Sequence, residues 1–534
     1  MKIGRLVILS VVAVAILSAV IVKSRQRFDT SFVMGANGLT SLKCNDVEFL
    51  ENGEFQVKLV TLRRPNGETY QGSTTGAIHV DQAKQELMKT LPWGKVNVKY
   101  KASKNQLTFT ISTTNTSASD TIQGVLYEPL TLKFPAKVKE YDNTTPLLAH
   151  SIGDVAVVRL SYGTGSVAVV NDDVDKPLMV GVPWANNRPT DTVFPLSVHT
   201  DRVRMYPDSY PVISRPIPPN GSDQYHVSLR FGGASATDIE LASDVYKKFS
   251  EVFPSQLKWP DRRPIGAIFL ATDSQYRQGN PRGWFGDASL NLAAPSGRET
   301  FKQRMLARAD ESIANMQDMK AQGVITWDIE GQEFARSVGY VGDPRMVNDL
   351  APEMGEVVDE YFSRFRNAGL RVGICVRPQQ FFRSPDRKTA TQSIIQDPVK
   401  ILVEKIRYAK ERWGVTLAYI DSNTTGKDPN PMDAALMQKV ATALPDVLLI
   451  PEHSNFRYYS FSAPFRELRQ GYVSTPDAVH AAYPNAFTLI YTADGPLDLY
   501  HNSLAAAVKR GDSLMYRAWY ADPQNEKVKS LVRR

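Results

Sequence analysis

The sequence predicts a multidomain protein of the β plus α/β class, in which an N-terminal β-sandwich precedes a (β/α)8 TIM barrel and a hydrophobic anchor opens the chain. Three observations support this fold class. The chain has 534 residues, enough for two or three domains. Residues 30–235 hold short alternating runs that are typical of half-buried strands. Residues 264–534 repeat a pattern of strand, loop and helix.

Residues 1–29 form the predicted membrane anchor or signal segment. Lys2 and Arg5 precede a 17-residue apolar run, 6–22, which only two serines interrupt. This run is long for a signal peptide and at the short limit for a spanning helix. Without a small-residue cleavage site before Lys23, we expect an uncleaved anchor, with a cleaved signal as the alternative. Both predict a membrane-anchored or secreted protein whose soluble domains are extracytoplasmic, in the periplasm or at the cell surface.

Residues 30–235 are the predicted sandwich. The runs 47–62 and 106–111 place apolar side chains at every second position, as in Leu107, Phe109 and Ile111. Further short strands follow with glycine, proline and asparagine between them, which is typical of a sandwich. We interpret the stretch from Asp81 to Lys89 as one short helix.

Residues 236–263 are predicted to be a helical linker. Leu241, Val245 and Phe249 recur at helical spacing, and Thr237 is a suitable N-cap. The proline-rich stretch that follows marks the boundary to the next domain.

Residues 264–534 are the predicted barrel. Glycines such as Gly369 and Gly414 end several of the helical stretches, as is usual at helix C-termini. A doubly wound open sheet is the alternative, but no strand is followed by a Gly-x-Gly-x-x-Gly turn. The predicted strands are Ile265–Ala271, Val324–Ile329, Val372–Val376, Leu417–Ile420, Val447–Ile450, Tyr472–Ser474, Phe487–Tyr491 and Ser513–Tyr516.

Composition narrows the classes of function. The net charge is +7, and no basic run with interleaved aromatic residues occurs, which argues against nucleic-acid binding. The two cysteines, Cys44 and Cys375, fall in different predicted domains, so we expect free thiols. Zinc motifs are missing, and we expect neither a metal nor another cofactor.

Polar and aromatic residues follow most of the predicted barrel strands. In a barrel of this kind the site lies at the C-terminal ends of the strands, so these side chains would converge on one mouth. Several carboxylates, one or two arginines and aromatic walls suit a neutral, polyhydroxylated substrate such as an oligo- or polysaccharide. The candidates are Trp327, Asp328, Glu330, Arg377, Asp421, Asn423, Glu452, His453, Asp494, Arg517 and Trp519.

Cleavage of a glycosidic bond needs two carboxyl groups, one ionised and one protonated. We assign Asp421 as nucleophile or base and Glu452 as acid/base, with Asp328 and Glu330 as competitors for the second role. All candidates other than Asp421 and Glu452, with Asp328 and Glu330 among them, are assigned to substrate binding, although Arg377 could instead neutralise the acidic mouth. Neighbouring strands leave retention and inversion both open.

The segment Tyr419-Ile420-Asp421-Ser422-Asn423 resembles the fourth-strand motif of the α-galactosidase and α-glucosidase clan. Residues 368–373, Ala-Gly-Leu-Arg-Val-Gly, are similar to the lead-in to the third strand in those enzymes. The resemblance implies a sandwich followed by a (β/α)8 barrel, an α-linked substrate, and Asp421 as the nucleophile of a retaining enzyme. The clan places its acid after strand six, where the sequence offers Asp477 at a predicted helix start.

Two other functions remain open. One is a non-catalytic carbohydrate-binding or cell-envelope protein with a degenerate barrel. The other is a metal-dependent hydrolase or lyase that uses Asp328, Glu330, His453 and Asp494 around one cation. The sequence leaves the oligomeric state undetermined.

Overall fold

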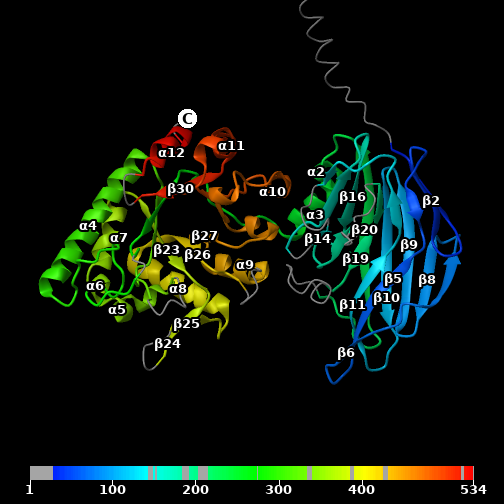
Figure 1. Cartoon of the computed structure of the whole chain (residues 1–534), viewed down its shortest axis with the longest axis horizontal. Coiled ribbons are helices and arrows are strands. Elements are labelled where there is room, and N and C mark those ends of the chain that lie inside the picture. Colours follow the sequence, from blue (N-terminus) through cyan, green and yellow to red (C-terminus); the bar gives the residue numbers. More distant parts are fainter. Residues whose placement is uncertain are drawn as a thin grey trace, which may run out of the picture. The chain divides into compact units, whose positions relative to one another are not determined.

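The computed structural model describes residues 28–141, 148–150, 153–182, 192–201, 214–272, 275–333, 340–384, 390–424, 431–518 and 522–532. The chain divides into two compact units, residues 1–245 and 246–534, each of which is described by itself (Figure 1). Most of the predicted anchor, residues 1–27, lies outside the described residues. Within the described residues, no helix combines the length and hydrophobicity that crossing a membrane requires.

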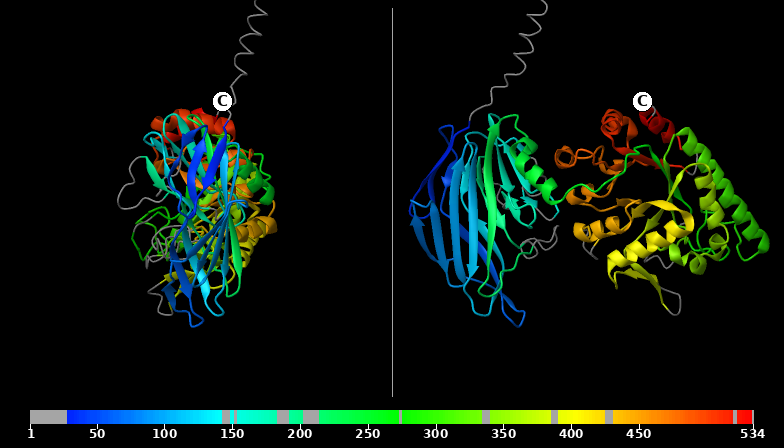
Figure 2. Two further views of the ribbon diagram at one scale, coloured as in Figure 1. Left: turned by 90° about the vertical axis from the view of Figure 1, so that its right-hand side faces the viewer. Right: turned by 180° about the vertical axis from the view of Figure 1, so that it is seen from behind.

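The first unit consists mainly of two antiparallel sheets. One has the strand order β13-β15-β16-β20-β10-β9-β8-β7 and the other β14-β17-β19-β11-β5-β6 (Figures 1 and 2). The strands are β1 (Thr30–Met34), β2 (Leu39–Cys44), β3 (Val47–Glu48), β4 (Leu50–Asn52), β5 (Gln56–Arg63), β6 (Thr69–Gln71), β7 (Ala77–Asp81), β8 (Glu86–Leu91), β9 (Gly94–Ser103), β10 (Gln106–Asn115), β11 (Thr121–Glu128), β12 (Thr131–Lys133), β13 (Glu140–Tyr141), β14 (Leu148–His150), β15 (Val157–Ser161), β16 (Gly165–Asn171), β17 (Met179–Gly181), β18 (Val193–Pro195), β19 (Ser197–His199) and β20 (Ser222–Gly233).

Alternating side chains explain why these strands pack face to face. In β10, Leu107, Phe109 and Ile111 are buried, and they belong to the same hydrophobic core as Val60 and Tyr127 of the other sheet. A shared core between two antiparallel sheets is the arrangement of a sandwich. The predicted short helix at 81–89 is wrong: β7 and β8 form a hairpin there. Leu87 and Leu91 keep the two-residue period, which outweighs the helix-forming residues between them.

Two short helices follow the last strand of the sandwich, α2 (Asp238–Leu241) and α3 (Ser243–Val252). The predicted cap at Thr237 is confirmed, because its hydroxyl accepts a hydrogen bond from the Glu240 N–H and the Glu240 carboxylate accepts one from the Thr237 N–H. The predicted single helix is interrupted at Ala242.

The second unit contains a nearly closed parallel barrel with the strand order β27-β26-β23-β22-β21-β30-β29-β28. The first strand, β21, pairs with both β22 and β30, so the sheet curls into a barrel instead of opening as a doubly wound sheet. No ladder joins β27 to β28 in the described residues. The strands are β21 (Ile265–Phe269), β22 (Gly323–Trp327), β23 (Arg371–Val376), β26 (Val415–Ile420), β27 (Leu448–Pro451), β28 (Phe465–Glu467), β29 (Leu489–Tyr491) and β30 (Ser513–Arg517).

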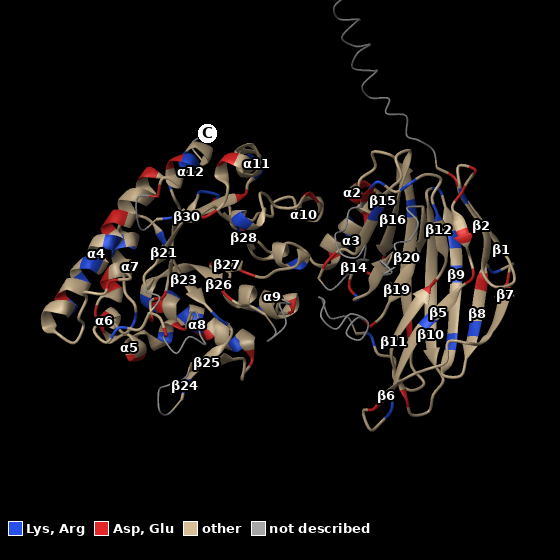
Figure 3. Ribbon diagram, in the orientation of Figure 1, with Lys and Arg blue, Asp and Glu red and all other residues tan. Residues whose placement is uncertain are grey.

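Helices surround the barrel, and α4 carries both signs of charge along its length (Figure 3). Gly414, at φ 70°, ends α8 in the left-handed conformation that glycine adopts most easily. A small hairpin of β24 (Gln380–Arg383) and β25 (Ala390–Ser393) follows β23. The other elements are α4 (Pro295–Asp318), α5 (Val347–Leu350), α6 (Pro352–Gly355), α7 (Val358–Asn367), α8 (Pro398–Trp413), α9 (Ala434–Ala443), α10 (Asp477–Ala482), α11 (Leu497–Arg510), α12 (Gln524–Val532) and the 3-10 turns η1 (Pro344–Met346), η2 (Phe456–Ser460) and η3 (Leu468–Gln470).

The sixth barrel strand differs from the prediction. Residues 472–474 are not a strand; the strand is β28, which ends at Glu467. Phe465 anchors it by packing edge-on against Tyr419, with ring centroids 5.1 Å apart. Tyr472, the apolar residue that suggested a strand, is instead 45% exposed.

Candidate active site

Side chains alternate between the inside and the outside of the barrel along each strand, and this alternation determines which residues reach the mouth. Inside the barrel, a cluster of buried residues includes Cys375, Tyr419, Ile450, Phe465 and Met515. Two positions further on, side chains on the same face of each strand reach the C-terminal end of the barrel. These residues are Arg377, Asp421, Glu452, Glu467 and Arg517.

Arg377 and Asp421 form a buried ion pair at the centre of this ring. The Arg377 Nε and Nη2 atoms lie 2.8 and 2.6 Å from Asp421 Oδ2. The third nitrogen, Nη1, donates to Gln392 Oε1 at 2.6 Å. Because the fork of the guanidinium is engaged on both sides, Arg377 holds the Asp421 carboxylate in one orientation.

The carboxyl group of Glu452 adjoins that of Asp421, and each group shifts the pKa of the other. Burial and the charge of Glu452 raise the pKa of Asp421 to about 6, although Arg377 acts in the opposite direction. Burial disfavours the charged form of Glu452, but His453, Asp421 and the Ser422 N–H, which donates at 2.7 Å, outweigh it and lower the pKa to about 2. The pair therefore holds one proton over several pH units.

Asn423 and His453 fix the turn that carries Glu452. The Asn423 amide donates to the His453 carbonyl and accepts from the His453 N–H, both at 2.8 Å. Asn423 is fully buried, so its predicted contact with substrate is taken up by protein atoms. The His453 ring remains partly exposed, with Nε2 3.4 Å from Glu452 Oε2.

Asp328 and Glu330 lie in different environments rather than along one strand. The strand β22 ends at Trp327, and Asp328 adopts a left-handed φ of 61°. Asp328 is 5% exposed, and neither of its carboxyl oxygens has a hydrogen-bond partner among the described residues. Burial, followed by the charges of Glu330 and Asp421, raises its pKa well above the usual range.

Glu330 lies near a fully buried lysine. Burial, together with the charge of Asp343, raises the pKa of Glu330 to about 7, against the effect of Lys405. Lys405 donates to the carbonyls of Arg377 and Gln379 at 2.8 Å each, so it supports the backbone beneath the arginine. Lys405 therefore gives structural support to Arg377, and Glu330 lies close to this lysine.

The other predicted residues lie in less central positions. Arg517 and Asp494 form an ion pair at the ends of β30 and β29. Trp327 is 3% exposed and stacks on Phe269 with ring centroids 4.8 Å apart, so it forms the floor of the mouth rather than an open wall. Trp519 lies outside the described residues.

The structure brings two further residues to the mouth. Glu467 was missed because the sixth strand was assigned to 472–474, although Phe465 and Glu467 already carry the two-residue spacing. Gln392 donates to the carbonyls of Tyr340 and Val341 at 2.9 and 2.8 Å while it accepts from Arg377. No sequence signal marks Gln392, because it reaches the site from a hairpin in a long loop.

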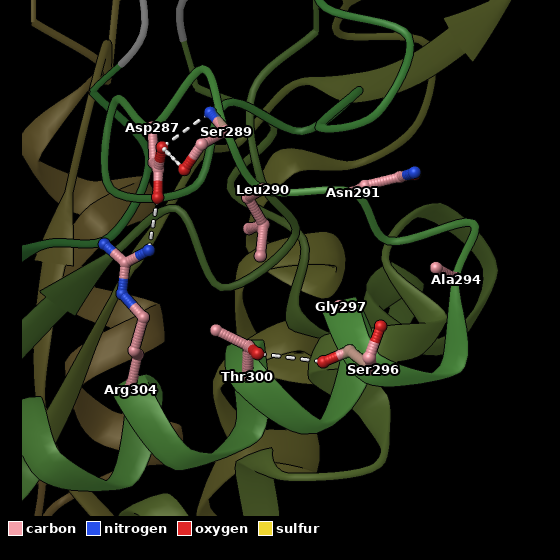
Figure 4. A pocket seen from close by; sticks show the side chains of 9 residues that line it. All are labelled: Asp287, Ser289, Leu290, Asn291, Ala294, Ser296, Gly297, Thr300 and Arg304. Atoms are coloured by element: carbon pink, nitrogen blue, oxygen red, sulfur yellow. Dashed lines mark hydrogen bonds and ion pairs between the residues drawn. The ribbon is translucent and has the colours of Figure 1, made fainter.

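In the described part of the chain, no group of three His, Cys, Asp or Glu side chains could hold a metal ion. Cys44 and Cys375 are free thiols, as expected. A cavity of about 290 Å³ lies at the start of α4, where Asp287 is bound by Ser289 and Arg304 (Figure 4). No mouth residue lines this cavity.

Neither a protein-family model nor a curated protein matches the chain. Among solved structures, it is similar to the α-N-acetylgalactosaminidase NagBb from Bifidobacterium bifidum in its GalNAc complex, with 9% identity, a TM-score of 0.52 and coverage of 95% of this chain and 93% of that one. A GH31 sulfoquinovosidase from E. rectale has 9% identity over 94% of this chain and 82% of its own, at a TM-score of 0.49.

The α-galactosidase from Lactobacillus brevis has 9% identity over 95% of this chain and 82% of its own, at a TM-score of 0.45. Only the similarity to NagBb exceeds a TM-score of 0.5 among these three, and at this identity it concerns the fold. The resemblance noted in the sequence is therefore confirmed for the architecture. The chain has a divergent version of a glycoside hydrolase fold, with a β domain followed by a nearly closed parallel barrel.

Proposed function

We propose that the protein is a glycoside hydrolase that cleaves an α-linked saccharide with two carboxyl groups and retains the anomeric configuration. The observation that carries the proposal is the buried Asp421 carboxyl group at the barrel mouth, which Arg377 holds in one orientation beside the carboxyl groups of Glu452 and Asp328. Glycosidic cleavage needs one carboxyl group that attacks in its ionised form and a second that donates a proton, and a cluster of carboxyl groups at one mouth offers candidates for both.

Asp421 is the proposed nucleophile. Arg377 holds its carboxylate at a fixed angle and balances its charge, which keeps an oxygen directed at one point in the mouth. The two oxygens of Asp328 that have no hydrogen-bond partner among the described residues are proposed to form hydrogen bonds with hydroxyl groups of the sugar, since a buried carboxyl group without partners gains most from them. Arg517, Asp494 and His453 would contact more distant parts of the substrate.

Two residues are candidates for the proton donor. Glu452 is the first candidate because it shares the proton with Asp421, but carboxyl groups in contact leave no room for a sugar between them. Retaining enzymes separate the two groups by about 5–5.5 Å. Glu467, on β28, is the second candidate, since it lies two strands from Asp421 and projects from the inner face of the barrel.

A substrate screen combined with substitutions tests the proposal. The purified chain is assayed against a panel of 4-nitrophenyl α- and β-glycosides, and the product anomer is followed by NMR. Asp421→Asn is expected to lose at least ~10²-fold in kcat on the substrate found. Asp498→Asn, an exposed carboxyl group on α11, serves as the control and is expected to keep full activity. A screen without turnover would contradict the proposal.

Leaving-group chemistry identifies the acid. A substitution of the true proton donor, either Glu452→Gln or Glu467→Gln, should spare a dinitrophenyl glycoside, whose leaving group needs no proton, while it slows an alkyl glycoside by at least ~10²-fold. A variant that slows both substrates equally does not remove the donor. If neither variant discriminates, the acid lies outside this pair of candidates.

A non-catalytic carbohydrate-binding protein remains the second candidate function. The observation in its favour is the close contact of the Asp421 and Glu452 carboxyl groups, which does not match the spacing of a working pair. It predicts that the protein binds a glycan but cleaves none of the panel.

A further inference from the structure

The loop between β22 and η1 is fixed where it passes the candidate site. The Gln392 amide donates to the carbonyls of Tyr340 and Val341 at 2.9 and 2.8 Å. The next carbonyl, that of Gly342, accepts from the Arg377 N–H at 3.0 Å. Because three successive carbonyls are bound, the backbone that carries the Tyr340 side chain has a defined position before any ligand arrives.

The ring of Tyr340 lies at the mouth. It packs against the cluster inside the barrel that includes Trp327 and Tyr419. The guanidinium of Arg377, which binds Asp421, lies over the same ring, 5.6 Å from its centroid. Tyr340 nevertheless remains partly exposed. These contacts place the ring beside the group that orients the proposed nucleophile.

The Tyr340 hydroxyl lies close enough to the acidic side chains of the mouth for their charges to act on it. Burial, followed by the charge of Asp328, raises the pKa of this hydroxyl, and Asp421 adds to the effect against the influence of Arg377. No hydrogen bond to the hydroxyl is found among the described residues. Asp328 is 5% exposed, and both of its carboxyl oxygens lack a partner in the same part of the chain.

The missing hydrogen bonds point to a ligand. Covering the Arg377–Asp421 ion pair requires only an aromatic ring, and phenylalanine would do this as well as tyrosine. The phenolic hydroxyl has no part in that role. A buried carboxyl group without partners costs free energy, which a hydrogen bond from a ligand would recover. A sugar hydroxyl can accept from the phenol and donate to the carboxyl group at the same time.

We propose that Tyr340 is a substrate-binding residue whose hydroxyl, together with the Asp328 carboxyl group, binds one hydroxyl group of the sugar that is held at Asp421. This inference rests on the proposed function and extends it, because it assigns specificity for that hydroxyl to a residue in the loop after the second barrel strand. A site built to bind a hydroxyl group rejects analogues that lack it, since its own polar groups then stay unpaired. The substrate class is therefore a glycoside with a free hydroxyl group at one fixed ring position.

Deoxy analogues of the 4-nitrophenyl glycoside found in the screen test this contact. The full chain and its Tyr340→Phe variant, which keeps the ring over Arg377, are assayed on the parent glycoside and on its 2-, 3-, 4- and 6-deoxy analogues. We expect Tyr340→Phe to lower kcat/KM on the parent glycoside by about 10- to 100-fold. On one analogue the variant and the unsubstituted chain should agree within about twofold, because the contact is already absent.

Two further variants complete the comparison. Asp328→Gly removes the carboxyl group and suits the left-handed backbone at this position, so it should abolish discrimination against the same analogue. Tyr472→Phe removes a hydroxyl from a tyrosine that is 45% exposed and is expected to leave kcat/KM unchanged on every substrate. The inference is overturned if Tyr340→Phe behaves as the unsubstituted chain, or if it slows the parent glycoside and all the analogues equally, as a purely structural effect would.

Equilibrium binding separates this inference from the glycosidase proposal. The chain carrying Asp421→Asn is titrated calorimetrically with the methyl α-glycosides of galactose, glucose and N-acetylgalactosamine. We expect at least one of them to bind, with a Kd about tenfold weaker after Tyr340→Phe is added. If this binding depends on Tyr340 but no glycoside is cleaved, the glycosidase proposal fails while the contact stands. If nothing binds and nothing is cleaved, both are overturned.

Discussion

At the scale of single residues, the arrangement around Arg377 is the most constrained part of the site. Its guanidinium contacts Asp421 on one side and Gln392 on the other, and the Gln392 amide uses its own N–H groups on two backbone carbonyls. The orientation of the amide is therefore fixed, with oxygen towards the cation and nitrogen towards the carbonyls.

Gln392→Glu should lower kcat on the screened substrate by about 10- to 100-fold, because it adds a charge that competes with Asp421 for Arg377 and leaves two carbonyls without a donor. A change confined to KM would contradict this role. The pH profile provides a further readout, since weaker pairing of Asp421 with Arg377 raises the pKa of Asp421 and moves the profile to higher pH.

The proton shared by Asp421 and Glu452 predicts the pH dependence of the reaction. The higher pKa of the pair, about 6 at Asp421, is the pH above which the free enzyme loses this proton. Because the proposed nucleophile must be ionised to attack, kcat/KM should rise as pH rises towards about 6, by about tenfold per unit below it. A profile that is flat from pH 4 to 7 would contradict the role of Asp421 as the nucleophile with a raised pKa.

Glu330 predicts a pH dependence of stability. Its pKa is raised to about 7 from 4.5 by burial, so the folded state binds its proton more tightly than the unfolded state does. Stability is therefore complete below pH 4.5 and falls as pH rises through 7, by about 3 kcal/mol for this group. Glu330→Gln should reduce this loss in urea unfolding of the barrel unit at pH 5 and pH 8; an unchanged difference would contradict the assignment.

At the scale of elements, β28 is short and depends on one aromatic anchor. Phe465 is 8% exposed and packs against Tyr419 and Tyr491 inside the barrel. Phe465→Ala should destabilise the barrel unit by about 3–4 kcal/mol through lost burial and the cavity that remains. Phe382→Ala removes an exposed ring of the same size and should cost less than about 0.5 kcal/mol in the same denaturant titration.

The same element shows where sequence reasoning succeeds and fails. Strands such as β23 and β26 were predicted close to their observed bounds, because continuous apolar runs bounded by glycine mark buried parallel strands. In β28 only Phe465 is apolar, so no pattern distinguishes the strand from a loop, and the exposed Tyr472 drew the prediction away.

The residues of the candidate site likewise divide into those that sequence patterns predict and those that they do not. Arg377, Asp421, Glu452 and Arg517 were found because each directly follows a recognisable strand. The backbone turn at Asp328 and the loop contact of Gln392 depend on tertiary packing and could not be predicted from sequence spacing.

At the scale of the whole molecule, the distribution of acidic side chains separates two mechanisms. The metal-dependent alternative required Asp328, Glu330, His453 and Asp494 to meet around one cation, but within the described ranges no three ligating side chains gather in this way. Incubation with EDTA followed by desalting should leave the hydrolysis rate of the screened glycoside within about twofold of the untreated protein. Loss of activity that Ca²⁺ or Mn²⁺ restores would favour the metal-dependent reading.

The open side of the barrel has a consequence for the chemistry. One backbone hydrogen bond, from Ala463 N–H to the Leu449 carbonyl at 3.0 Å, and the side-chain bond from Arg466 to Ser454 cross from the segment at β28 to that at β27. Glu467, the second candidate acid, lies across this join from Asp421, the proposed nucleophile. Side-chain contacts, and not a strand ladder, therefore hold the two carboxyl groups at their separation, so we expect substitutions at Arg466 or Ser454 to change the distance on which retention or inversion depends.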